Sequence, residues 1–298
     1  MIAQDLVPNV ANVNVEKLVK TNTMHASADR HKPEVNSNFA NGYTNMALPD
    51  TIHEVIQRLE QIVEDCVKTD AREGYFAALY LRVTRQVSKK IDERYFDDNA
   101  RMERLDVVFA NRCLAAYDQY RQQQPCSASW QLAFDTCHRW PPLVLQHLLM
   151  GMNAHIGLDL GIAAATVCPG KAIEALHSDF NKINEILASL VNTVQDEIAQ
   201  IWPLLKPIDW LAGKLDEEIA VFSMDMARDA AWKVALDYAA LTTEADQETY
   251  RNTRDAIVAA FGKKIAHPGW IISIVIGVLR AFERGDVKSK IEALSEVA

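Results

Sequence analysis

Two histidines and one aspartate lie at helical spacing in the least charged part of the chain. His147, His155 and Asp159 are separated by multiples of four residues, so they line one face of a helix. Gly151 stands midway between the histidines, where its missing side chain leaves room for a neighbouring helix or for a ligand. Asp159 is the only Asp, Glu, Lys or Arg in residues 141–170. A helix so apolar is buried, and its polar side chains need partners, because an unpaired buried polar group costs roughly 2–7 kcal/mol.

The residue types on this face suit a metal ion. His155 and Asp159 are one turn apart, about 6 Å along the helix axis, and can share one ion as an H-x-x-x-D pair. His147 is about 12 Å from His155 and suits a substrate contact or a second ion. Asp179, beside the core face of the following helix, is the leading candidate for a further ligand. We therefore predict a divalent metal, zinc or iron, held by His155, Asp159 and Asp179. The alternative is a hydrogen-bonded network that only holds helices in register.

The segment HLLMGMNAHIGLDL, residues 147–160, resembles the signature of a bacterial all-helical family catalogued as a domain of unknown function. The family pattern is Gly-x-Asn-Ala-His-Ile-x-x-Asp-Leu, and this chain matches it from Gly151 to Leu160. The resemblance includes VFANRCLAAYDQY (108–120) and FSMDMARDAAWKVA (222–235), and it spans most of residues 50–285.

The resemblance implies a grouping of residues but no activity. It brings together the polar face at 147–159 and residues of three other segments, which are Arg112, Asp179, Arg228 and Trp232. Arg112 lies among apolar positions of its own helix, where a guanidinium needs a carboxylate or an anionic ligand. We predict catalytic roles for four residues, with structural ion pairs as the alternative for the arginines: His147, Asn153, Arg112 and Arg228.

Two functions from different classes fit these residues. The first is a metal-dependent enzyme that acts on a small, largely apolar substrate in a buried helical pocket, by hydrolysis with zinc or by oxidation with iron. The alternative is a metal-free helical protein that binds a small molecule, whose polar group the His/Asp face orients. A terpene-cyclase-like site at Asp97-Asp98-Asn99 lacks its second acidic motif, and the serine-hydrolase and dinucleotide-binding motifs are absent.

Composition narrows the partners and the compartment. The net charge of −9 and the absence of basic runs disfavour nucleic-acid binding, whose affinity comes mainly from neutralising phosphates. The five cysteines form no C-x-x-C pair, which fits reduced thiols. The first twenty residues contain no apolar signal segment, so we expect a cytoplasmic protein.

Helical periodicity continues through most of the chain, and no segment alternates like a strand. We predict an all-α fold, a single bundle-like domain of eight or nine helices over residues 49–285. A flexible leader would precede it at 1–48, and a tail would follow at 286–298. Thr51 and Glu54 form a capping box that predicts where the first helix begins.

The longest strongly apolar run is WIISIVIGVL, residues 270–279. Ten residues are too few to span a bilayer, so we expect no membrane span. We expect a buried core helix here. The alternative is a dimer face, which would make the protein a homodimer.

Overall fold

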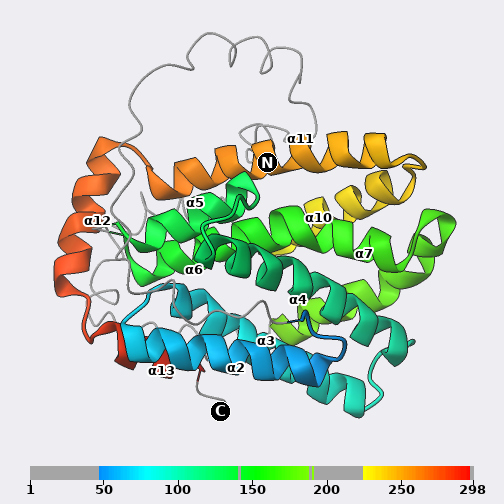
Figure 1. The fold of residues 1–298 in the computed structure, drawn as a ribbon, viewed down its shortest axis with the longest axis horizontal. Coiled ribbons are helices and arrows are strands. Elements are labelled where there is room, and N and C mark those ends of the chain that lie inside the picture. Colours follow the sequence, from blue (N-terminus) through cyan, green and yellow to red (C-terminus); the bar gives the residue numbers. More distant parts are fainter. Residues whose placement is uncertain (1–46, 140–141, 188–189, 191–223, 296–298) are drawn as a thin grey trace, which may run out of the picture. The chain divides into compact units, whose positions relative to one another are not determined.

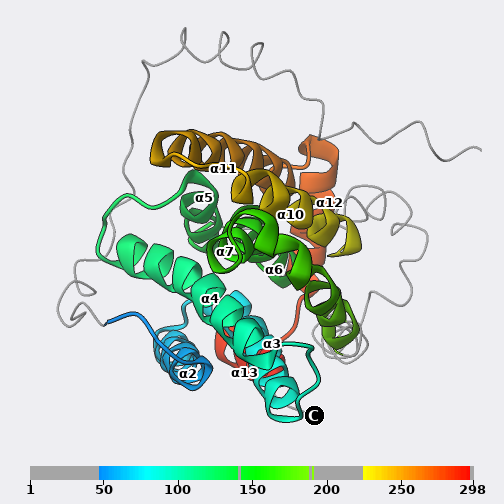
Figure 2. The same cartoon turned by 90° about the vertical axis from the view of Figure 1, so that its right-hand side faces the viewer.

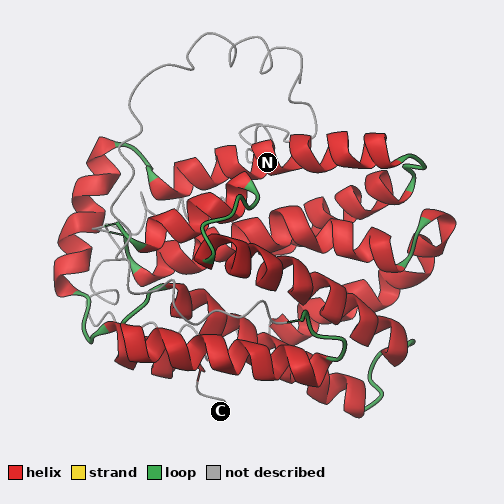
Figure 3. Cartoon of the chain, in the orientation of Figure 1, coloured by secondary structure: helices red, strands yellow, loops and turns green. Residues whose placement is uncertain are grey.

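The computed structural model describes residues 47–139, 142–187, 190 and 224–295, all of which belong to one compact unit. These residues form helices and no strands, which confirms the all-α prediction (Figures 1 and 3). There are ten described α-helices: α2 (Ile52–Thr69), α3 (Glu73–Asp92), α4 (Asn99–Arg121), α5 (Ala128–Cys137), α6 (Val144–Ala154), α7 (Gly161–Val167), α10 (Met224–Ala239), α11 (Glu244–Ala266), α12 (Trp270–Phe282) and α13 (Val287–Ser295). The leader predicted at 1–48 falls outside the described residues, except for its last two residues.

Side-chain hydrogen bonds cap the N-terminal ends of α2 and α4. The Thr51 hydroxyl accepts a hydrogen bond from the backbone N–H of Glu54, whose carboxylate accepts one from the Thr51 N–H, so the capping box is present. Asp98 caps α4 by accepting from the backbone N–H of Arg101. In the segment Asp97-Asp98-Asn99, Asp98 therefore serves as the N-cap of a helix.

The helix that carries the His/Asp face is the centre of the described fold. It runs from Val144 to Val167 without a break, as α6, a π-helical segment His155–Leu160, and α7. It contacts α3, α4, α5, α10 and α11, and Figure 2 shows α6 and α7 between α3 and α4 on one side and α10 and α11 on the other. By length and composition alone this helix could cross a membrane, but 89% of its apolar window is buried inside the protein, as in a core helix of a soluble fold.

The π-helical segment lies within residues 147–160, the segment that carries the family resemblance. In His155–Leu160 the backbone hydrogen bonds run from i to i+5, and α-helix precedes and follows it. This interruption divides the long helix into two, and the described residues within 49–285 form nine α-helices, in line with the eight or nine predicted there. Short π segments inside α-helices are frequent at functional sites, and Asp159 lies in this segment.

The C-terminal residues differ from the prediction. We expected a tail at 286–298, but Val287–Ser295 form α13, which packs on α2 and α3. Ile291 and Leu294 are fully buried in the same core cluster as the first two helices. Val287, Ile291 and Leu294 recur at helical spacing, but a helix of nine residues is stable only when its apolar face packs on other elements, here α2 and α3.

The apolar helix α12 contributes to a small cluster. Ile276 is buried with Leu143, with Leu279 packed beside them, whereas Phe282 at its end is 56% exposed. The core role expected for this segment is thus visible at Ile276. A homodimer stays a prediction.

Gly151 allows a neighbouring helix to approach the His/Asp face. A Cβ atom at this position would lie 2.3 Å from Cγ of Phe76 in α3. Of the two occupants expected for this gap, the side chain of the neighbouring helix fills it. The space between His147 and His155 is therefore part of the core.

We predict that Gly151→Ala destabilises the protein by about 1–3 kcal/mol, because the Phe76 ring has to move. Urea unfolding measures the change. Gly277→Ala in α12 is the matched control, since a Cβ there meets no atom within 4 Å and alanine favours a helix by up to about 1 kcal/mol. Equal effects of the two substitutions would contradict this role of Gly151.

Candidate functional site

Asp159 lies at the centre of a buried polar cluster that joins three helices. Its Oδ1 atom accepts a hydrogen bond from Nε of Arg112 in α4, and its Oδ2 atom accepts one from Nε1 of Trp130 in α5, each at 2.8 Å. The Asp159 residue is 1% exposed. The cation that a buried carboxylate requires is therefore supplied by Arg112.

His155 packs as an aromatic ring beside this cluster. Its Nδ1 atom lies 3.7 Å from Oδ2 of Asp159, which is longer than a hydrogen bond, and no described residue bonds either ring nitrogen. The ring stacks on Phe109 at 3.5 Å between centroids and meets the edge of Tyr80 at 4.4 Å. Burial lowers the pKa of His155 despite the neighbouring carboxylate, so the imidazole is neutral.

His147 lies at a separate place in the core. It is 4% exposed, and its ring centroid is 5.6 Å from that of Tyr75. Burial, followed by the charges of Arg72 and Arg280, lowers the pKa of His147 to about 3. Its distance from His155, about 12 Å along the helix, keeps it away from Asp159.

Asp179 does not join the pair that it was predicted to complete. Its carboxylate accepts hydrogen bonds from the backbone N–H groups of Asp97 and Asp98, from Arg101 at 2.8 Å and from Lys182 at 3.1 Å. It therefore stabilises the N-terminal end of α4. Arg101 is eleven residues before Arg112, about 16 Å along that helix, so Asp179 and Asp159 occupy different sites.

Arg228 and Asn153 also lie apart from Asp159. Arg228 donates a hydrogen bond to the carbonyl of Phe180 and lies over its ring at 4.4 Å, with Trp232 packed 5.0 Å from the same ring. Asn153 donates to the carbonyl of Val258 in α11 at 3.0 Å. The resemblance grouped all these residues in one place, but their described contacts put them in separate clusters.

The donor set around Asp159 does not form a metal site. Within the described ranges, no three His, Cys, Asp or Glu side chains come together in a way that could hold an ion. His155 and Asp159 are close enough to share one, but the predicted third ligand, Asp179, is bound elsewhere. Both oxygens of Asp159 already accept hydrogen bonds.

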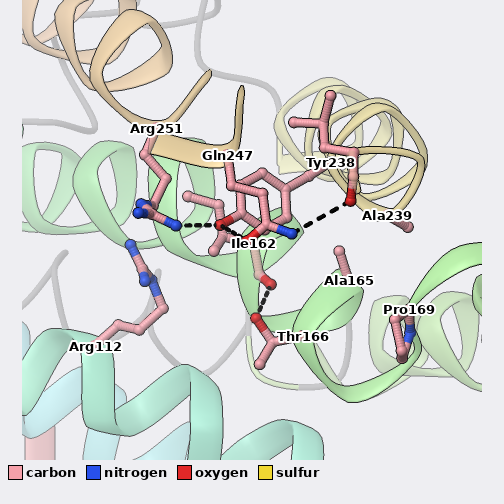
Figure 4. Close-up of a pocket in the computed structure, with 10 residues that line it drawn as sticks. Arg112, Ile162, Ala165, Thr166, Pro169, Tyr238, Ala239, Gln247 and Arg251 are labelled. Atoms are coloured by element: carbon pink, nitrogen blue, oxygen red, sulfur yellow. Dashed lines mark hydrogen bonds between the residues drawn. The ribbon is translucent and has the colours of Figure 1, made fainter. Parts of the chain in front are cut away.

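Arg112 belongs both to the buried cluster and to the lining of a pocket of about 410 Å³ (Figure 4). Its Nε atom is held by Asp159, and its side chain is 30% exposed. Figure 4 shows the Arg112 guanidinium directed toward that of Arg251, which comes from α11. The described lining contains these two arginines and no Asp or Glu: Arg112, Ile162, Ala165, Thr166, Pro169, Tyr238, Ala239, Leu241, Gln247 and Arg251. We call it the arginine pocket.

The opposite wall of the arginine pocket is held by polar contacts. Arg251 donates hydrogen bonds to the Tyr238 hydroxyl and to the exposed carboxylate of Glu244 at 2.6 Å. Gln247 donates to the carbonyl of Leu241 at 3.3 Å. The contacts with Tyr238 and Leu241 orient Arg251 and Gln247 before any ligand is present.

A second pocket, of about 470 Å³, also has Arg112 in its lining. It is formed by one face of α4, by the start of α5 and by Leu48, and Asp159 is part of its wall. Its lining is Leu48, Val108, Asn111, Arg112, Ala115, Ala116, Gln119, Ser127, Trp130 and Asp159. We call it the α4 pocket.

Sequence reasoning missed Trp130 and Arg251. A signal for Trp130 existed, because a buried carboxylate needs donors and a buried indole N–H needs an acceptor. Arg251 had no such signal, since it lies in a strongly charged helix that resembles an ordinary solvated surface.

The fold and the site define an all-helical protein with a buried Arg–Asp–Trp cluster beside an arginine-lined pocket. The model of a family of unknown function, DUF5995, matches residues 52–268, and the chain belongs to this family. No curated protein and no solved structure matches the chain.

We predict that His147 makes stability fall in acid. Its pKa is about 3 in the folded protein and ordinarily 6.5, so between these values the unfolded state binds more protons. The free energy of unfolding then decreases, as pH drops below about 6.5, by up to about 1.4 kcal/mol per pH unit. His147→Phe removes this contribution, which urea unfolding between pH 7 and 5 measures. His53→Phe, at an exposed position, is the control, and a His147→Phe profile parallel to wild type would refute the assignment.

We predict that Asp159→Asn destabilises the fold by about 2 kcal/mol or more. An amide supplies one acceptor where Arg112 and Trp130 need two, and the arginine loses its charge partner. Thermal or urea unfolding measures the loss. Asp237→Asn, which disrupts an exposed ion pair with Lys233, should change stability by less than about 1 kcal/mol. Similar effects for the two variants would show that the buried cluster does not stabilise the fold.

Proposed function

We propose that this protein is a metal-free helical protein that binds small amphipathic anions in the arginine pocket. The observation that carries the proposal is the pair of guanidinium groups, Arg112 and Arg251, in a pocket whose described lining has no acidic residue. Two like charges that face each other are stabilised by an anion between them. In a chain of net charge −9, such a pocket is a local exception.

The geometry of Arg112 supports a role in ligand binding. Asp159 accepts a hydrogen bond from Nε alone, so the two Nη groups remain available for bidentate contact with a carboxylate or a phosphate. Trp130 fixes the other oxygen of Asp159, which in turn fixes the orientation of the guanidinium. The ligand-binding group is therefore preorganised, which reduces the entropy lost on binding.

The rest of the arginine pocket accommodates a molecule that is polar at one end only. Ile162, Ala165 and Leu241 offer apolar contacts, whereas Thr166 and Gln247 offer hydrogen bonds. A few converging polar groups in an apolar lining are typical of small-molecule sites. The metal-dependent enzyme expected from the sequence is the weaker proposal, because its ligands do not converge.

Isothermal titration calorimetry with octanoate and with octyl phosphate tests the proposal. We expect Arg112→Gln and Arg251→Gln each to weaken binding by about 10-fold or more, since a hydrogen bond to a charged group contributes roughly 1.5–3 kcal/mol. Arg284→Gln, an exposed arginine outside the pocket, is the charge-matched control. Binding that is absent in wild type, or unaffected by both pocket substitutions, would overturn the proposal. The relative affinity of the two probes identifies the preferred anionic group.

A further inference from the structure

The two pockets share one wall. Arg112 lines both the arginine pocket and the α4 pocket, and Asp159 holds its Nε atom between them. A ligand that binds Arg112 in the arginine pocket therefore contacts a residue that also lines the α4 pocket. The aliphatic stem of Arg112 offers apolar surface along this path.

The α4 pocket is suited to an apolar chain. Val108, Ala115 and Ala116 recur on one face of α4, where the two alanines leave space, and Trp130 and Leu48 complete apolar walls. Leu48 is 44% exposed. The adjacent Pro49 accepts a hydrogen bond from Nδ2 of Asn111 at 2.8 Å, which keeps this segment beside the pocket.

The charged residues of the two pockets favour one orientation of a bound amphipathic ligand. The described lining of the arginine pocket has two arginines and no Asp or Glu, whereas that of the α4 pocket has Arg112 together with its partner carboxylate, Asp159. An anionic group is thus favoured in the arginine pocket and disfavoured in the α4 pocket. The apolar part of an amphipathic anion has the opposite preference.

We propose that the two pockets form one binding site for an elongated amphipathic anion, such as a medium- or long-chain alkyl carboxylate. Its head group lies between Arg112 and Arg251, and its chain passes over Arg112 into the α4 pocket. This inference rests on the proposed function and adds the class of ligand.

A chain-length series tests the inference. Calorimetry with hexanoate, octanoate, decanoate and dodecanoate should show affinity rising with each methylene by up to about fourfold, the equivalent of roughly 0.8 kcal/mol. Ala115→Phe fills the α4 pocket, and we expect it to retain hexanoate binding and to lose most of the gain for dodecanoate. Ala100→Phe, at an exposed position on the same helix, should behave as wild type.

A second variant tests the α4 pocket in case Ala115→Phe does not fold. Leu48→Glu places a carboxylate at the α4 pocket from an exposed position, so the fold should tolerate it, and dodecanoate binding should weaken by about 10-fold or more with hexanoate binding unchanged. Arginine-dependent binding that does not vary with chain length, or that neither variant alters, overturns the elongated site alone. Failure of every carboxylate to bind, with arginine-dependent binding of octyl phosphate retained, overturns the ligand class alone. Binding that does not depend on the arginines, or no binding of any carboxylate or of octyl phosphate, overturns the proposed function as well.

Discussion

A buried carboxylate in an apolar helix constrains much of the described structure. Asp159 loses nearly all its hydration, and this cost is offset only if donors come to it from other helices. Arg112 of α4 and Trp130 of α5 supply them, so the cluster fixes how both helices contact the central helix. The same contact turns the free side of the guanidinium toward the pockets. The stability of the fold and the proposed ligand binding therefore both depend on Asp159.

The polar residues of the central helix act in different ways because their surroundings differ. Asp159 pairs with the Arg112 guanidinium, whereas burial lowers the pKa of His155 and of His147 and favours their neutral forms. The flat His155 ring packs between Phe109 and Tyr80, and Gly151 admits Phe76 beside it. The two histidines of the central helix therefore pack in the core. Asp159, in the π-helical segment, is the residue of this helix that forms an ion pair.

Net charge and local charge have separate consequences. The acidic composition disfavours nucleic-acid partners, but it does not describe the arginine pocket, whose described lining has two arginines and no Asp or Glu, the carboxylates paired with them lying outside this lining. Small-molecule recognition depends on such local arrangements, because a screened charge acts over only about 8–10 Å at physiological salt.

The sequence by itself determined the all-α class, the helix start at Thr51, and the need of Asp159 for a cation. These follow from local rules, because periodicity, capping and desolvation involve residues close in the chain or a single buried group. Tertiary structure alone decided which cation answers that need, and it placed Asp179 at the N-terminal end of α4 and Arg228 on Phe180. It also brought Arg251 to Arg112 from 139 positions away in the chain. Which of these residues meet depends on the relative positions and rotations of the packed helices. Those are determined by many side-chain contacts across the core.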